Sequence, residues 1–190
     1  MTLKEKSDKI TNRGSSKQVY VLDASAIYNG VLGQNIVGFK YIPECVLSEI
    51  RGMLRGEAII EEALLYEDLK IISPNKSSLL KIKKHAEETG DIQELSQCDL
   101  SVIALAMDLT LQKNITVILS DDYDIQNLAS HIGLLFKGIH WKGITTIHKY
   151  QWICPACGAN SKQKRTHCLE CGTEMVRKTI KKKIRKKGDS

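Results

Sequence analysis

The sequence lacks the features of a membrane-bound or secreted protein. No run of eighteen apolar residues occurs among its 190 residues, and no signal-peptide pattern is present. We therefore expect a soluble protein of the cytoplasm. A glycine-rich phosphate loop of the Walker type is also missing, which argues against an NTPase.

The basic residues are concentrated near the end of the chain. Residues 151–190 contain 11 Lys and Arg residues against 3 Asp and Glu residues, whereas residues 1–150 contain 17 against 19. A nearly neutral body with a strongly basic end favours a polyanion as partner, most simply nucleic acid.

Short apolar runs alternate with helical patterns over residues 18–139. The length fits one core of about 120 to 130 residues plus a small satellite. Strands are expected at residues 19–22, 39–42, 70–72, 116–119 and 134–136. Helices are expected at residues 24–30, from 43 to about 54, and at 57–69, 75–88, 100–111 and 123–131. This alternation predicts an α/β fold with a doubly wound parallel sheet.

An aspartate stands at the end of the first expected strand. The stretch Val19–Ala26, VYVLDASA, reads as a buried strand that runs into a helix, with Asp23 at the junction. Ligands of open parallel sheets bind at the carboxyl ends of the strands. Asp is also a good N-cap, and taken alone Asp23 is better explained as a cap.

Further acidic residues occupy related places. Glu49 lies on the second helix, Asp99 opens the central helix, and Asp121 and Asp122, with Asp124 nearby, follow the strand at 116–119. Each has a purely structural alternative, because these aspartates can cap helices or form turns and Glu49 can be a solvated helix residue. As a set they favour a site for Mg²⁺ or Mn²⁺, since neighbouring carboxylates repel unless a cation lies between them. Such sites typically serve phosphoryl chemistry.

These motifs carry a family resemblance. Four segments of this chain resemble the four acidic motifs of PIN-domain ribonucleases. They are Asp23-Ala-Ser-Ala, Glu49 in the segment from Pro43, Asp99 before an apolar helix, and Ser120-Asp-Asp. The segments Thr89-Gly90-Asp91, Leu95–Asp99 and Asp121–Asn127 narrow the resemblance to the NOB family, whose members trim the 3′ end of small-subunit ribosomal RNA.

The resemblance implies a metal-dependent endoribonuclease that leaves 5′-phosphate and 3′-hydroxyl ends. Precursor small-subunit rRNA and the precursor of the small ribosomal subunit would be its partners. Carried onto this chain, the metal ligands would be Asp23, Glu49, Asp99 and one or both of Asp121 and Asp122, with the choice within the last group left open. Ser25 and Ser120 would assist through their hydroxyl groups.

Two Cys-x-x-Cys pairs give the most specific motif of the chain. They consist of Cys154, Cys157, Cys168 and Cys171, and a glycine follows each pair. Four thiolates at this spacing predict a structural Zn²⁺ site in a small ribbon, because a lone redox pair would not explain two copies. Cys45 and Cys98 are interpreted as small buried apolar residues.

The ribbon is expected to carry an RNA-binding surface. Its basic residues include Lys162, Lys164 and Arg165, and Tyr150 and Trp152 stand at its entrance. Basic and aromatic groups together suit single-stranded RNA, although Trp152 can equally belong to the ribbon core. The lysine-rich end would add salt-sensitive affinity or remain a solvated tail.

The expected organisation follows the chain. It comprises a basic flexible leader at 1–17, the PIN nuclease domain at 18–139, a linker at 140–150, the zinc ribbon at 151–177 and a basic tail at 178–190. Two alternatives to the rRNA-trimming enzyme remain: a non-catalytic RNA-binding factor for ribosome assembly, and a toxin-type PIN ribonuclease that cuts tRNA or mRNA.

Overall fold

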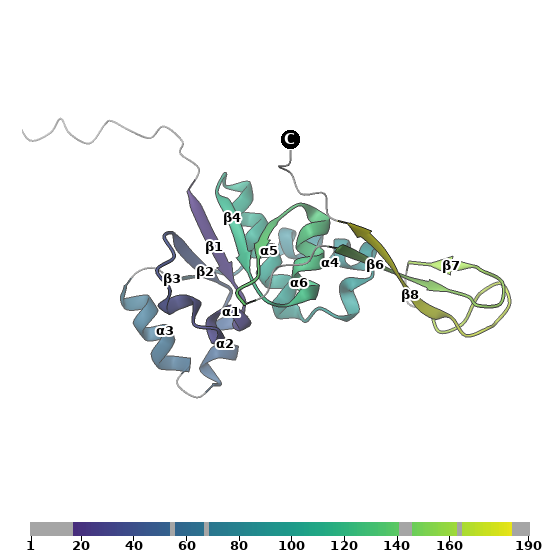
Figure 1. The fold of residues 1–190 in the computed structure, drawn as a ribbon, viewed down its shortest axis with the longest axis horizontal. Coiled ribbons are helices and arrows are strands. Elements are labelled where there is room, and N and C mark those ends of the chain that lie inside the picture. The colour runs from purple at the N-terminus through teal and green to yellow at the C-terminus, as the bar shows by residue number, and fades with distance from the viewer. Residues whose placement is uncertain (1–16, 54–55, 67–68, 141–145, 163–164, 184–190) are drawn as a thin grey trace, which may run out of the picture.

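The structure, a computed structural model, describes residues 17–53, 56–66, 69–140, 146–162 and 165–183. Almost all of the expected leader and the last part of the expected tail lie outside these ranges. Within them the chain forms a larger α/β domain and a smaller domain built on a long hairpin (Figure 1).

A five-stranded parallel sheet forms the centre of the larger domain. Its strand order is β3-β2-β1-β4-β5. The strands are β1 (Gln18–Leu22), β2 (Phe39–Ile42), β3 (Leu69–Ile71), β4 (Ile115–Leu119) and β5 (Leu135–Lys137). The chain builds outward from β1 in one direction through β2 and β3, and then in the other through β4 and β5. The switch point of the sheet therefore lies between β1 and β4, and the predicted doubly wound fold is confirmed.

Six helices and two short 3₁₀ turns connect these strands in the described part of the chain. The helices are α1 (Ala24–Tyr28), α2 (Glu44–Arg51), α3 (Gly56–Leu65), α4 (Lys76–Thr89), α5 (Gln97–Leu111) and α6 (Tyr123–Ile132). The 3₁₀ turns are η1 (Val31–Gly33) and η2 (Asp91–Gln93).

Helix α5 lies at the centre of the hydrophobic core. It packs against β1 and β4 of the sheet and against α2, α4 and α6. Nine of its fifteen residues are buried, including Leu100, Ile103 and Leu105. The expectation that a helix apolar nearly all round must be buried centrally is confirmed.

The largest error in a helix boundary lies at the end of α3. The helix expected at 57–69 ends at Leu65 in the structure, and Leu69 already belongs to β3. Leu69 is buried and pairs with Lys40 of β2, so burial and strand pairing determine its conformation rather than its helix propensity.

Cys45 and Cys98 were interpreted as small buried apolar residues; Cys98 is buried, but the two cysteines form a disulfide, which that interpretation missed. The bond joins α2 to the start of α5, where the two Cα atoms lie 5.6 Å apart. A separation of 53 residues in the sequence gave no sign of this proximity, which arises only when the two helices pack.

The smaller domain is a three-stranded antiparallel sheet. Its strands are β6 (Thr146–Ile153), β7 (Asn160–Ser161) and β8 (Val176–Lys183), in the order β7-β6-β8. Strand β6 begins inside the expected linker, and β8 continues into the expected tail. Both segments gain strand structure because they pair with each other from Thr146–Lys183 to Ile153–Val176.

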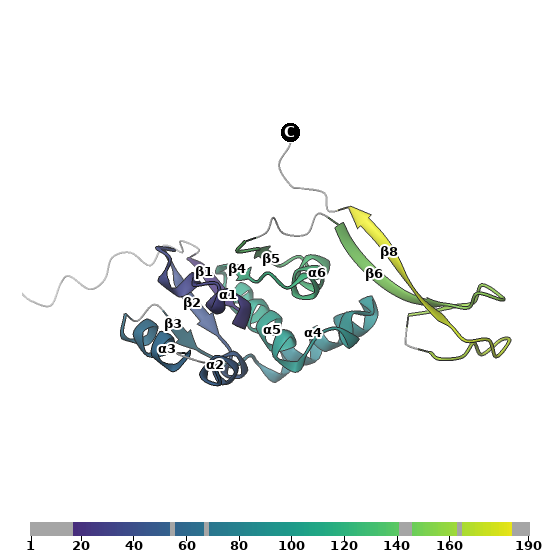
Figure 2. The same ribbon diagram turned by 60° about the horizontal axis from the view of Figure 1, so that its bottom comes forward.

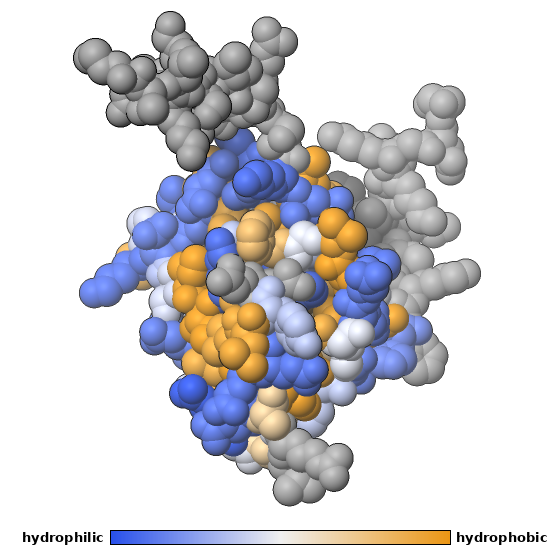
Figure 3. Space-filling view, turned by 90° about the vertical axis from the view of Figure 1, so that its left-hand side faces the viewer, coloured by the Kyte–Doolittle hydropathy of each residue, from blue (hydrophilic) through white to orange (hydrophobic). Residues whose placement is uncertain are grey.

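The larger domain exposes apolar side chains on the side away from the ribbon. Figure 3 views this side and shows a group of apolar residues among polar ones. Exposed apolar residues of β2, α3 and the segment after β3 include Phe39, Leu65 and Ile72. None of the described helices is long and apolar enough to cross a membrane.

Candidate active site

Asp23 lies at the carboxyl end of β1, beside the switch point of the sheet. It caps α1, because its Oδ1 accepts a hydrogen bond of 2.8 Å from the Ala26 N–H. The hydroxyl of Ser25 donates to Oδ1 at 2.8 Å, and that of Ser120 donates to Oδ2 at 2.5 Å. Only 6% of Asp23 is exposed, so its position is fixed from several sides.

The two serines orient the acids in the structure. Leu22 and Leu119 are partners across β1 and β4, so Asp23 and Ser120 follow equivalent positions of adjacent strands. Ser120 Oγ also accepts from the Asp122 N–H at 3.0 Å, and Ser25 Oγ accepts from the Asp121 N–H at 3.2 Å. Their hydroxyls thus connect the ends of both strands.

Glu49 and Asp99 approach Asp23 from α2 and α5. Burial raises the pKa of Glu49, and the negative charges of Asp99 and Asp23 raise it further. Burial likewise raises the pKa of Asp23, against the effect of its hydrogen bonds, and the charge of Asp122 adds to the increase. The charges of Asp99 and Asp23 thus act on Glu49, and the charge of Asp122 acts on Asp23.

Asp121 and Asp122 face different directions. Asp121 accepts hydrogen bonds from the N–H groups of Ile139, at 2.7 Å, and His140, at 3.3 Å, and from the side chain of Asn29. Partial burial acts to raise its pKa, but these backbone bonds lower it overall. The sequence left the choice within this pair open, and in the structure it is Asp122 whose charge acts on Asp23.

Glu49 separates the two interpretations of the acids. Asp23, Asp99 and Asp122 each cap a helix, and Asp99 completes the expected capping box with Ser96. Their capping bonds alone would explain these three. Glu49 caps nothing, and no described residue forms a hydrogen bond or ion pair with its carboxylate. Glu49 is exposed, as a solvated helix residue would be, but the charges of Asp99 and Asp23 act on it, which favours a site that holds a cation.

The donor chemistry of this edge fits Mg²⁺ or Mn²⁺. Carboxylate oxygens are the ligands that these hard cations prefer, and the mutual repulsion of the acids favours a cation. Among the described residues, no three carboxylates have ligand atoms as close together as those of the cysteine cluster below. Mg²⁺ usually retains several waters and uses only one or two carboxylates, so a wider arrangement is compatible with it.

The four cysteines of the smaller domain converge as expected. The Sγ atoms of Cys154, Cys157, Cys168 and Cys171 all lie within 4.8 Å of one another. Cys154 and Cys168 are buried, and Trp152 packs against them. Four thiols at such distances fit tetrahedral Zn²⁺ coordination in a closed structural site.

The described basic residues of the expected RNA surface differ in exposure. Lys162 is exposed and Arg165 is half-buried, while Lys164 lies outside the described residues. Tyr150 does not stand free at the ribbon entrance, because the Arg177 guanidinium stacks on its ring at 3.8 Å and also pairs with Glu94 of the larger domain.

Sequence reasoning missed the contacts that hold the ribbon against the larger domain. They involve Asp91, Asn127, His131 and His148. Asp91 and Asn127 lie in segments that carry the family resemblance, but nothing in the sequence showed that they meet.

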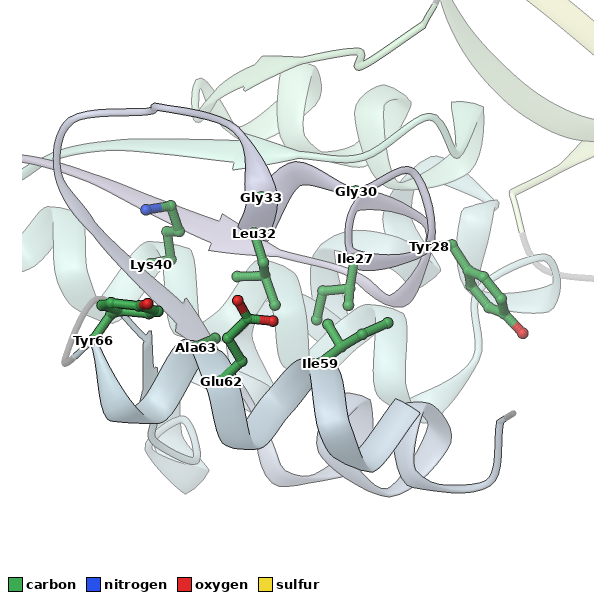
Figure 4. A pocket seen from close by; sticks show the side chains of 10 residues that line it. All are labelled: Ile27, Tyr28, Gly30, Leu32, Gly33, Lys40, Ile59, Glu62, Ala63 and Tyr66. Carbon is green, nitrogen blue, oxygen red and sulfur yellow. The ribbon is translucent and has the colours of Figure 1, made fainter. Parts of the chain in front are cut away.

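A cavity of about 450 Å³ lies apart from the acidic residues. Figure 4 shows that α1 and the η1 turn form one wall and α3 the other. Its lining includes Tyr28, Lys40, Glu62 and Tyr66, and none of the predicted site residues.

Comparisons with known proteins agree with the geometry. A family model described as the PIN domain of ribonuclease matches residues 20–109. The chain is 33% identical to an Endoribonuclease Nob1 of Methanocaldococcus jannaschii, over 92% of this chain and 85% of that protein. It is 35% identical to the Endoribonuclease Nob1 of Pyrococcus abyssi, over 80% and 89% of the two chains. It is also 33% identical to Ribonuclease VapC1 of Thermoplasma acidophilum, over 87% and 80%.

Proposed function

The chain belongs to the Nob1 family of PIN-domain endoribonucleases, and from this premise we propose that it cuts precursor small-subunit rRNA at or near its 3′ end. The observation that carries this proposal is the position of Glu49. Glu49 is exposed on α2, the charges of Asp99 and Asp23 act on it, and it has no cationic or hydrogen-bonding partner among the described residues.

The residues at the switch point have distinct tasks in this proposal. Asp23, Glu49, Asp99 and Asp122 would hold Mg²⁺ or Mn²⁺, which activates water and stabilises charge on the phosphate when bound. Ser25 and Ser120 keep the Asp23 carboxylate in one orientation through their hydroxyls. Asp121 anchors the chain after β5 through Ile139 and His140, so we assign it a supporting task.

The ribbon would supply RNA affinity rather than chemistry. A closed Cys₄ site folds its domain and leaves no open coordination position. Lys162 and Arg165 belong to the same domain and add positive charge suited to phosphates. Precursor rRNA, alone or within the precursor of the small ribosomal subunit, is the proposed partner, and the cytoplasm the proposed compartment.

A cleavage assay with the full chain tests this proposal. The substrate is an RNA spanning the 3′ end of precursor small-subunit rRNA, incubated with Mn²⁺ or with Mn²⁺ and a chelator. We expect one metal-dependent cut near the mature end, with 5′-phosphate and 3′-hydroxyl products. Glu49→Gln should abolish the cut without unfolding the protein, because Glu49 caps no helix. Glu61→Gln, on the exposed part of α3, is the matched control.

Two other outcomes would replace the proposal. Tight RNA binding with no cut in any divalent metal would indicate a non-catalytic assembly factor. The similarity to Ribonuclease VapC1 supports a second candidate, a ribonuclease for tRNA or mRNA. Preferred cutting of those RNAs over the precursor rRNA would establish it.

A further inference from the structure

The hairpin of β6 and β8 contacts the larger domain through the backbone of His148. Strand β6 lies beside α6 (Figures 1 and 2). The His148 N–H donates to Asn127 Oδ1 at 2.7 Å, and Asn127 Nδ2 donates to the His148 carbonyl at 2.8 Å. The Asn127 amide thus pairs with β6 in both directions, as a neighbouring strand would.

A buried aspartate holds this amide in place. Asp91 is fully buried, and its Oδ1 accepts a second bond from Asn127 Nδ2 at 2.9 Å. Its Oδ2 accepts from the Thr89 hydroxyl at 2.5 Å. His131 Nε2 lies 3.0 Å from the same His148 carbonyl. Polar networks that are buried and fully paired favour a single geometry. We call Thr89, Asp91, Asn127 and His148 the docking network.

A close backbone approach adds to the docking network. Gly90 has a φ of +81°, and a Cβ at this position would lie 3.0 Å from Tyr150 of β6. Beside it, Arg177 of β8 stacks on Tyr150 and pairs with Glu94 of the larger domain. The position of the ribbon is therefore determined by contacts on both of its long strands.

Docking creates a cleft that neither domain forms alone. It measures about 270 Å³ and lies between the end of α4 with η2 and the ribbon. The larger domain contributes Glu87, Gly90, Ile92 and Gln93, and the ribbon contributes Trp152, Lys162 and Arg177.

The lining of this cleft has the chemistry of a nucleotide site. An indole ring such as that of Trp152 stacks with any nucleobase, and Gln93 offers an amide donor and acceptor for a base edge. Lys162 is exposed and forms no ion pair with a described residue, so its charge is available to a phosphate. Arg177 is held at the same wall by Tyr150 and Glu94.

The cleft is linked to the acidic residues through α6. This helix begins next to Asp122 of the acidic group and carries Asn127 of the docking network one turn later. Asp124 lies between them, since the charges of Asp122, Glu94 and Asp91 all act on it. Helix α6 therefore connects the acidic group to the docking network that positions the ribbon.

We propose that this cleft binds one nucleotide of a single-stranded RNA, with its base against Trp152 and its phosphate at Lys162, and that the docking network builds the site. This rests on the proposed ribonuclease function and names where the substrate is held beside the cut. Asp91 and Asn127 are positioning residues, because they act on the RNA only through the ribbon.

Tryptophan fluorescence of the full chain tests the proposal. Trp141→Phe leaves Trp152 as the single tryptophan. Without added Mn²⁺, a short single-stranded RNA should quench its emission, whereas heparin, a polyanion without bases, should not. Lys162→Gln should weaken the affinity measured this way about fivefold, and Lys178→Gln is the matched control. The register places Lys178 on the opposite face of β8 from Arg177, so its loss should have less effect.

Asp91 variants test the docking network. Asp91→Ala removes the partner of Asn127 and should weaken binding about fivefold or more, near the lower value for one stacked base. Asp91→Asn should keep affinity within about twofold, since an amide can accept from Asn127 and donate to Thr89. Zinc content checks that the ribbon remains folded in each variant, and cleavage of a short RNA that the ribbon cannot reach should be unchanged.

Several results would overturn the proposal. These are equal quenching by heparin and RNA, no quenching by RNA at all, or undiminished quenching in zinc-loaded Asp91→Ala. Failure here is separable from failure of the proposed function. A protein that cuts precursor rRNA without Trp152 quenching refutes only the cleft, and quenching without any cut refutes only the nuclease proposal.

Discussion

Two buried, hydrogen-bonded aspartates, Asp23 and Asp91, have neighbouring charges of opposite sign. Burial raises the pKa of both carboxyls. Around Asp23, the neighbouring charge of Asp122 raises the pKa further. Around Asp91, the charges of His131 and Arg177 lower it, and Asn127 and Thr89 pair with its oxygens. The comparison shows that one acid is balanced by the protein itself, whereas the other leaves negative charge that a bound cation can neutralise.

The largest expected effect is on cleavage, which replacement of Asp by Asn should lower far more at Asp23 than at Asp91. Asp23→Asn should lower Mn²⁺-dependent cleavage roughly a thousandfold, since metal stabilisation of the transition state is worth several kcal/mol. Asp91→Asn should leave cleavage within a few-fold of the unmodified rate. Single-turnover cleavage of the same RNA measures both.

Stability provides the control for that comparison. The pKa of Asp23 is raised in the folded state, so its ionised form opposes folding at neutral pH, and Asn at this position should keep or increase the urea midpoint. A large loss of stability in Asp23→Asn, or unchanged cleavage, would contradict a metal-binding task for this residue.

A smaller effect is expected from the disulfide beside the acids. The acidic edge has a covalent link between α2 and α5, whereas the docking network has only hydrogen bonds and ion pairs. Replacing Cys45 and Cys98 by Ala should lower the free energy of unfolding by about 3 kcal/mol, because the bond closes a long loop in the unfolded chain. Urea denaturation with and without a reducing agent, in excess zinc, measures the difference. If reduction leaves the midpoint of the unmodified protein unchanged, the bond contributes nothing to stability.

The smallest expected effect is the change of Mn²⁺ affinity with pH. Metal binding needs ionised carboxylates, and the pKa values of Asp23 and Glu49 are raised by burial and by neighbouring acids. Mn²⁺ affinity should therefore fall with decreasing pH while the pH is still above about 4, where ordinary carboxyls remain ionised. Isothermal titration of Mn²⁺ at several pH values measures this. Asp121, whose pKa is lowered, provides the control, since Asp121→Asn should not move the titration.

The sequence predicted the fold well because local patterns determine most of it. All five strands of the parallel sheet follow from short apolar runs. The central position of α5 follows from the apolar residues on nearly all of its faces. The end of α3 was wrong because Leu69 is drawn into β3 by its pairing with β2. The length of the ribbon hairpin was underestimated because β6 and β8 support each other across more than twenty intervening residues.

The acidic group was predictable for a different reason. Asp23, Asp99 and Asp122 follow strand ends or begin helices, and Glu49 lies on the second expected helix, so all four positions can be read from a pattern. The choice of Asp122 over Asp121 depended on Ile139 and His140, which follow another strand. The docking network was missed entirely because Thr89, Asp91, Asn127 and His148 meet only after two domains pack.

Helix α6 determines the spacing between the acidic group and the docking network. From Asp122 to Asn127 it advances five residues, or about 7.5 Å at the usual rise per residue. That length corresponds to about two stacked nucleotides of one strand. One added residue in this turn would rotate Asn127 by about 100° relative to the acidic group and direct the ribbon elsewhere. The position of the ribbon relative to the acidic group thus depends on less than two turns of α6.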